Sequence, residues 1–153
     1  GVTMLSSNRS TLQNPLFSTA SLRPLPHHRI PENQSLHDRV VREIAEYNHS
    51  KGKYVRADHI SWVHGKPDKV EFHVPDLAIY DSTGITFVEV ETLDSALSGH
   101  SVAQIRSFCR KGVTVLVLAL PQVTMSNQAL IKYRVNEITK KFEHFDNLAI
   151  IEY

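Results

Sequence analysis

The segment "HVPDLAIYDSTGITFVEVET", His73 to Thr92, contains two apolar runs separated by a short polar link. The runs "KVEFHVPDLAIY", which begins at Lys69, and "ITFVEVET" are rich in β-branched and aromatic residues, and "DSTG" between them is typical of a tight turn. The segment therefore predicts a β-hairpin. Three acids interrupt it: Asp76 follows a proline, and Glu89 and Glu91 alternate with valine.

The three acids can share one face of the hairpin. Glu89 and Glu91 point the same way because side chains two apart on a strand face the same side. A turn centred on residues 82–83 places Asp76 opposite Glu89, and a turn centred on residues 83–84 places it opposite Glu91. A three-residue loop would break the alignment unless a bulge restored it.

Three carboxylates on one face call for a cation. Like charges across a strand pair destabilise it, and desolvated carboxylates shift each other's pKa unless a cation intervenes. Oxygen ligands without sulfur or an obvious histidine set favour Mg²⁺ or Mn²⁺ over zinc. Pro75 cannot donate to a β-ladder, so strand pairing should loosen at Asp76.

A plainer interpretation stays open for these acids. Glu89 and Glu91 could form the solvent face of an amphipathic strand, with Asp76 as an unrelated turn residue. Ile85 and Phe87 lie on the same face as the two glutamates and favour burial of that face.

The rest of the chain predicts alternating helices and strands. Residues 1–34 are rich in proline, serine and asparagine and predict an arm, either extended or disordered, before a domain of residues 35–153. Ser35 can cap a first helix with Asp38 three residues later. The inward stripe of this helix is predicted to be Leu36, Val40, Ile44 and Tyr47, and the helix should end before Gly52.

Further predicted elements follow from periodicity and turn signals. They are strands over 53–63, 69–80 and 85–92, a helix over 101–111, a strand over 112–121, a helix over 126–142 and a strand over 148–153. The continuously apolar 112–121 run is typical of a strand buried on both faces. The order α-β-β-β-α-β-α-β predicts an α/β fold with a mixed sheet flanked by helices.

Composition sets the protein class. The chain has 153 residues, a formal net charge of +1 and one cysteine, Cys109, which we expect to pack in the core rather than act as a nucleophile. No apolar run approaches the roughly 18 residues of a membrane span. These features favour one soluble domain in the cytoplasm, with no membrane partner.

Charged residues outside the hairpin supply weaker candidates. Glu43 lies at the edge of the first helix's apolar stripe and could look towards the three acids, although a flanking glutamate is more often solvated. The nine histidines show no ligand spacing that indicates zinc. Phosphate contacts could come from basic residues on several elements, although each alone is more often a solvated surface charge: Arg39, Arg42, Lys66, Lys69 and Arg106.

The order of these motifs resembles the PD-(D/E)XK nuclease superfamily, which has the restriction-endonuclease-like fold. The resemblance rests on "PD" at residues 75–76, "VEVET" at 88–92 and "AQIRSF" at 103–108, in elements from about residue 35 to 120. It implies that Asp76 and Glu89 are metal ligands, with Glu43 as the first-helix acid. "HD" at the start of a helix and the later "EVET" also resemble nuclease-related proteins of plasmids and mobile elements.

The resemblance implies metal-dependent hydrolysis of phosphodiester bonds in DNA with Mg²⁺ or Mn²⁺. A homodimer would supply the two sites that cutting both strands requires. Glu91 takes the place of the motif's lysine and would position or deprotonate the attacking water, and Gln104 would hold the phosphate or the water. A cation such as Arg106 or Lys111 would then neutralise the phosphate. The alternative is an inactive nuclease-fold module that binds nucleic acid or a protein partner.

Overall fold

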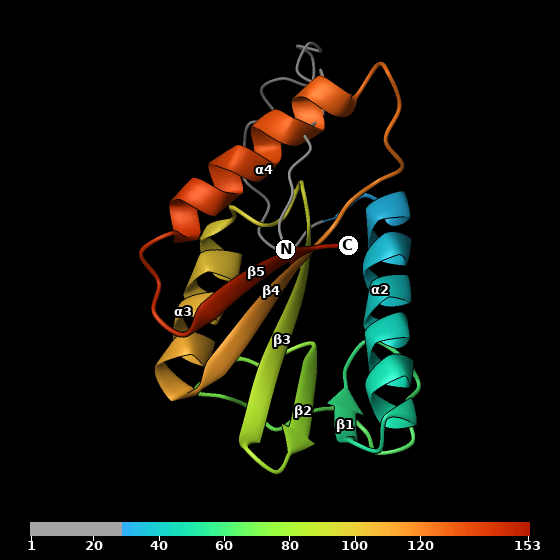
Figure 1. Ribbon diagram of the computed structural model, residues 1–153, viewed down its shortest axis with the longest axis vertical. Coiled ribbons are helices and arrows are strands. Elements are labelled where there is room, and N and C mark those ends of the chain that lie inside the picture. Colours follow the sequence, from blue (N-terminus) through green and yellow to red (C-terminus); the bar gives the residue numbers. More distant parts are fainter. Residues whose placement is uncertain (1–28) are drawn as a thin grey trace.

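The computed structural model describes residues 29–153, which form a five-stranded mixed sheet flanked by three helices (Figure 1). The helices are α2 (Pro31–Ser50), α3 (Gly99–Lys111) and α4 (Gln128–Phe142). The strands are β1 (Tyr54–Ala57), β2 (Leu77–Asp81), β3 (Gly84–Thr92), β4 (Val113–Ala119) and β5 (Leu148–Glu152). The predicted element order and α/β class are confirmed.

The strands lie in the sheet in chain order, β1-β2-β3-β4-β5. β1, β2 and β3 pair antiparallel through short connections, whereas β3, β4 and β5 pair parallel. The parallel pairs need crossovers, and α3 and α4 provide them. β4 is thus paired on both edges and apolar on both faces, as its sequence predicts.

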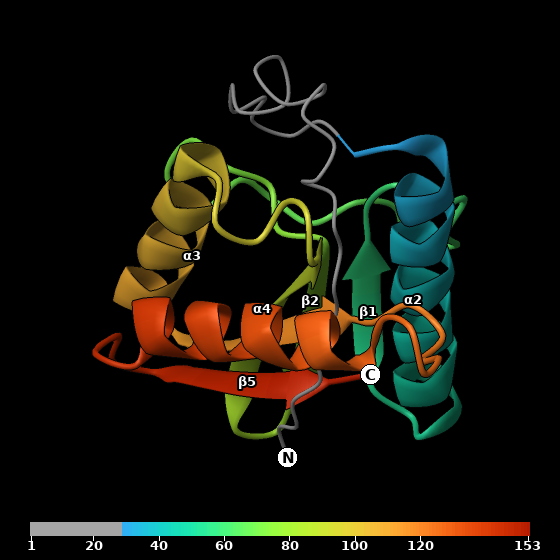
Figure 2. The same ribbon diagram turned by 90° about the horizontal axis from the view of Figure 1, so that it is seen from above.

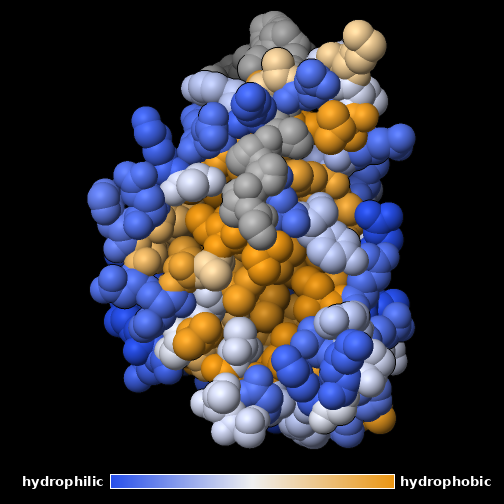
Figure 3. All heavy atoms as spheres, in the orientation of Figure 1, coloured by the Kyte–Doolittle hydropathy of each residue, from blue (hydrophilic) through white to orange (hydrophobic). Residues whose placement is uncertain are grey.

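Hydrophobic core clusters lie on both faces of the sheet. α2 packs on one face and α3 with α4 on the other, as Figure 2 shows from above. The α4 side chains predicted to point inward are all buried: Ile131, Val135, Ile138 and Phe142. On the α2 face a further hollow remains beside that helix, and Figure 3 shows apolar side chains gathered there. Its lining includes Ile79, Val88, Val117 and Ile151.

The first helix differs from its prediction in start and rotation. It begins at Pro31 rather than Ser35, because proline's fixed φ suits the first helical position and needs no amide partner there. Its buried residues are His37, Val40, Val41 and Ala45, whereas Tyr47 is 62% exposed. The predicted stripe is therefore wrong at Tyr47. Most of the predicted arm, residues 1–28, lies outside the described residues.

The first two strands are shorter than predicted. β1 ends at Ala57, and β2 begins only at Leu77. Val70 and His73 pair with each other in an isolated bridge instead of extending β2. Pro75 accounts for this difference, since a residue without an amide hydrogen cannot continue the ladder.

The hairpin adopts the first of the two predicted registers. Asp81 pairs with Gly84 and Leu77 with Val88, so the turn is centred on residues 82–83. The same register, continued by one residue, places Asp76 opposite Glu89 at the end of the pairing. This register decides the geometry of the candidate site.

Candidate metal and catalytic site

Three buried carboxylates meet at one cavity beside the end of β3. Asp76, Glu89 and Glu91 are 3%, 4% and 1% exposed and all line a cavity of about 330 Å³. Gln104, from the second turn of α3, lines the same cavity. The interpretation of the two glutamates as a solvent face is therefore wrong, and the structure brings together four of the predicted site residues.

Asp76 is held in place by backbone and imidazole groups. Its Oδ2 accepts a hydrogen bond from the Val90 amide at 2.8 Å and lies 3.0 Å from His37 Nε2. Its Oδ1 lies 3.2 Å from His59 Nε2. Burial opposes ionisation of this carboxyl, but the two imidazoles outweigh burial and hold the pKa of Asp76 well below its usual range.

The same contacts act on the two imidazoles. Burial lowers the pKa of His37, but the charge and hydrogen bond of Asp76 outweigh it, so the net shift is upward. The hydrogen bond to Asp76 also raises the pKa of His59. Asp76 is thus an ionised carboxylate that favours positive charge on both of its neighbours.

The pKa of Glu89 is shifted in the opposite direction to that of Asp76. Its Oε1 accepts a hydrogen bond from the Asp76 amide at 3.1 Å, in place of the ladder bond that ends there. Burial, together with the charges of Asp76 and Glu91, raises the pKa of Glu89 well above its usual value. A proton or a metal ion at this position would relieve the cost of burying the charge.

Glu91 is surrounded by donors. Its Oε1 accepts a hydrogen bond from Ser95 Oγ at 2.6 Å and lies 3.3 Å from Arg29 Nη2. Burial raises the pKa of Glu91, while Ser95 and Arg29 act against that shift. Arg29 also donates to the Val90 carbonyl and to Thr92 Oγ1, which fixes its guanidinium at the end of β3.

Three residues of this site were not predicted from the sequence: His37, His59 and Arg29. His37 carried a signal, because it lies one turn before Val40 and Val41 on the buried face of α2. His59 and Arg29 carried none, since His59 falls in a stretch that was predicted to be strand and Arg29 in the predicted arm. Only the tertiary fold brings these three residues to the acids.

Glu43 does not join the cavity. Its Oε1 accepts a hydrogen bond from the Tyr153 hydroxyl, and its other carboxylate oxygen lies 3.9 Å from Arg39 Nε. The expectation that it looks towards the three acids is wrong. α2 instead presents His37, six residues earlier, to Asp76.

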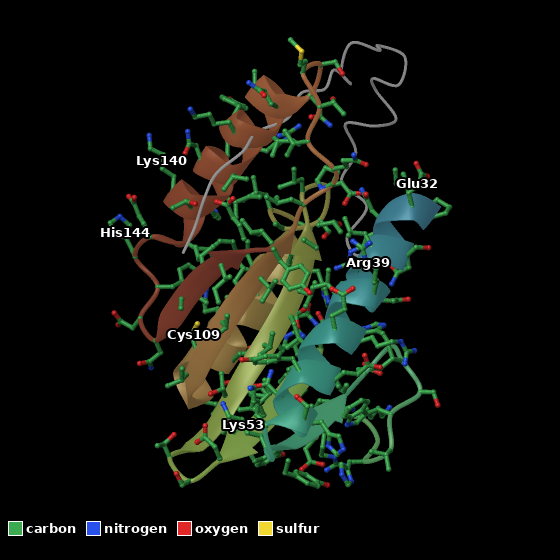
Figure 4. All side chains as sticks on the ribbon, turned by 45° about the vertical axis from the view of Figure 1, so that its right-hand side comes forward. Glu32, Arg39, Lys53, Cys109, Lys140 and His144 are labelled. Carbon is green, nitrogen blue, oxygen red and sulfur yellow. The ribbon has the colours of Figure 1, made fainter. Side chains whose placement is uncertain are left out.

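The predicted phosphate-binding residues lie away from the cavity wall. Arg39 is exposed on α2 (Figure 4). The loop that follows α4, in which Figure 4 labels His144, lies on the other side of the molecule. Arg106 points towards that loop, where its guanidinium lies 4.6 Å from the centre of the Phe145 ring. Among arginines and lysines of residues 29–153, Arg29 alone lines the cavity. The remaining predicted basic residues are exposed and not part of its lining: Arg42, Lys66 and Lys69.

One group of side chains among residues 29–153 has its ligand atoms close enough together to hold a metal ion: those of His37, His59 and Asp76 lie within 4.8 Å of one another. The carboxylate set of Asp76, Glu89 and Glu91 lines one cavity and shares Asp76 with that group. Cys109 is buried among apolar side chains of the α3 and α4 core, which confirms its predicted packing role.

Comparison of the chain with protein-family models, with curated proteins and with solved structures found no match. Within residues 29–153, none of the helices is both long enough and apolar enough to cross a membrane.

Proposed function

We propose that this chain is a metal-dependent nuclease with a restriction-endonuclease-like fold that hydrolyses phosphodiester bonds in DNA. The observation that carries the proposal is the convergence of Asp76, Glu89, Glu91 and Gln104 on one cavity. Burying three carboxylates together costs free energy that an uncharged core would not incur. A bound divalent cation offsets that cost and provides a reason to keep the acids there.

The carboxylate set fits Mg²⁺ or Mn²⁺, which prefer oxygen ligands. Asp76 and Glu89 lie opposite each other across the end of the hairpin and would hold the ion. When bound, such an ion polarises a phosphate and lowers the pKa of water.

The remaining residues have distinct roles in this proposal. Glu91 would orient the attacking water and take its proton, and its raised pKa places it closer to neutral pH, where a general base works best. Ser95 holds the Glu91 carboxylate in position. Arg29 supplies the positive charge that the motif lysine would otherwise bring to this strand. Gln104 would hydrogen-bond the phosphate.

Asp76→Asn tests the proposal on supercoiled plasmid DNA with Mg²⁺ or Mn²⁺. Asparagine keeps an oxygen that can accept from the Val90 amide but removes the charge. We expect the cleavage rate to fall by roughly 10³-fold or more, as for loss of a major electrostatic group in an active site. The matched control is Asp146→Asn, on the exposed loop after α4, which should cut as fast as the wild type. Equal cleavage by Asp76→Asn, or no cleavage by the wild type with either metal, would overturn the assignment.

The products of the same assay report on assembly. Cutting both strands requires two sites, so we propose that a homodimer makes linear DNA, whereas one chain alone would make nicked circles. Light scattering of the active sample would compare its mass with that of a monomer. A monomeric sample that linearises DNA in one step would contradict the dimer.

One observation favours a second candidate, an inactive nuclease-fold module that binds nucleic acid or a protein partner. Glu91 stands where the motif has lysine and is already engaged by Arg29 and Ser95. Calorimetric titration of Mn²⁺ in the absence of DNA, read together with the plasmid assay, separates the two candidates. Binding together with cleavage supports the enzyme, and absence of both supports the module.

A further inference from the structure

Two imidazoles approach the Asp76 carboxylate from different directions. His37 Nε2 lies 3.0 Å from Oδ2, and His59 Nε2 lies 3.2 Å from Oδ1. Two ligands bound to one ion at about 2.1 Å each, with a right angle between them, are about 3 Å apart. Both separations thus match neighbouring positions in a coordination sphere. The two rings meet edge to face, 5.0 Å between centres, so neither blocks the other.

His37 is oriented as metal-binding histidines usually are. Its Nδ1 lies 2.9 Å from Asp38 Oδ1, and Gln34 Nε2 donates to the same oxygen at 2.9 Å. A carboxylate on one ring nitrogen fixes the tautomer and directs the other nitrogen at the ion. The ring is buried, so its direction is set by the surrounding α2 residues rather than by solvent.

His59 is held in an unusual backbone conformation. Its φ is 67°, which lies in the left-handed region that residues other than glycine seldom adopt. Two hydrogen bonds support it: the His59 amide donates to Asp58 Oδ1, and the Asp58 amide donates to the Asp76 carbonyl, both at 2.9 Å. Strain of this kind persists where the surroundings require one geometry, often at a functional site. Here the geometry directs the ring at Asp76.

We propose that His37, His59 and Asp76 bind one metal ion, and that the site selects a transition ion such as Mn²⁺, Co²⁺ or Zn²⁺ over Mg²⁺. Imidazole nitrogen is a good ligand for these ions and a poor one for Mg²⁺, which prefers oxygen and water. The inference rests on the proposed function to the extent that the same ion would serve the nuclease reaction through Asp76.

The decisive variant is His59→Asn, titrated with Co²⁺, Zn²⁺, Mn²⁺ and Mg²⁺ by calorimetry without DNA. Asparagine tolerates the left-handed φ better than most residues, and His59 is 42% exposed, so the variant should fold. We expect it to lose at least tenfold in Co²⁺ and Zn²⁺ affinity and less than threefold in Mg²⁺ affinity. The matched control His144→Asn, at an exposed position on the distant loop, should bind as the wild type does.

Many sites bind Co²⁺ more tightly than Mg²⁺, so the selective loss in the variant carries the test rather than the wild-type preference alone. His37→Gln, checked for folding by its thermal transition, should show the same selective loss. Unchanged Co²⁺ affinity in His59→Asn, or the same loss for all four ions, overturns the inference.

The metal site and the proposed nuclease function can be contradicted separately. Selective metal binding without DNA cleavage under any metal would leave the metal site standing and end the nuclease assignment. Cleavage supported by Mg²⁺ and unaffected in His59→Asn would do the reverse.

Discussion

β3 and β4 are neighbours in the sheet. On the face that α3 covers, β3 carries buried carboxylates where β4 carries buried apolar side chains. Glu89 pairs with Leu116 and Glu91 with Leu118, and all four side chains are buried. A leucine there contributes apolar burial to the fold, whereas a carboxylate loses hydration. β4 therefore adds apolar burial to the stability of the fold, whereas the second half of β3 buries carboxylates at a cost in free energy.

The largest effect on stability should come from replacing a buried leucine of β4. Leu116→Ala removes a fully buried side chain from the α3 and α4 core. We expect the free energy of unfolding to fall by about 2–5 kcal/mol, measured by urea denaturation. Leu116 is not part of the cavity lining, so Mn²⁺ affinity should be unchanged. A loss below 1 kcal/mol would show that this face is not a tightly packed core.

Replacing a buried glutamate of β3 should raise the free energy of unfolding, whereas replacing Leu116 lowers it. Glu89→Gln retains an oxygen that can accept from the Asp76 amide but cannot ionise. Without metal at neutral pH we expect it to be about 1–3 kcal/mol more stable than the wild type, the order of the cost of leaving a buried polar group without a partner.

The pH dependence of that difference follows from the raised pKa of Glu89. The folded protein holds the proton more tightly than the unfolded chain, so wild-type stability falls as pH rises above the ordinary value of 4.5. The advantage of Glu89→Gln should therefore vanish below about pH 4.5. Urea denaturation from pH 4 to 8 measures it, and a constant difference would contradict the assigned cause.

Arg29 should have a smaller effect, confined to the chemistry at Glu91. Arg29→Gln removes the cation that pairs with the Glu91 carboxylate. We expect cleavage to slow by about tenfold, roughly 1.4 kcal/mol, with the rate–pH profile shifted upward because Glu91 loses a charge that lowers its pKa. A slower rate with an unshifted profile would mean that Arg29 acts on the phosphate instead.

The smallest effect should come from an exposed carboxyl that has a partner. Glu71 accepts two hydrogen bonds from Arg110, which lower its pKa to about 2. Its small contribution to stability is present above the ordinary value of 4.5 and is lost as pH falls to about 2, the reverse of Glu89. Glu71→Gln should lower the denaturation midpoint slightly at neutral pH, and less at high salt. An unchanged midpoint at low salt would show that the pair adds nothing.

The hairpin shows how far local sequence reasoning reaches. The turn residues and the alternation of Glu89 with valine predicted the shared face of the acids in either of two even registers, because pairing geometry is regular. The structure decided between these two registers. Element order was predictable for the same reason. Strand length was overestimated where Pro75 ended the ladder, although the proline itself signalled that end.

The rest of the site depends on contacts between distant segments. His37 and Asp76 are 39 residues apart, and Arg29 and Glu91 are 62 apart. The rotation of α2 about its axis decides whether His37 or Glu43 faces the acids. The predicted apolar stripe of this helix did not fix that rotation, because apolar residues also occur beside the stripe. The conformation of His59 is local, but no single residue type signals it.

If the acids of β3 are kept for a cation, the stability of the protein must respond to that cation through Glu89. Thermal or urea denaturation of the wild type and Glu89→Gln is compared without metal and with saturating Mn²⁺. Without metal the variant should be the more stable protein. An ion at about 1,000 times its dissociation constant adds about 4.1 kcal/mol to the protein that binds it, which exceeds the variant's advantage of about 1–3 kcal/mol, so Mn²⁺ should reverse the order. If Mn²⁺ stabilises both proteins equally or stabilises neither, the buried glutamates do not hold a cation and the proposed site is wrong.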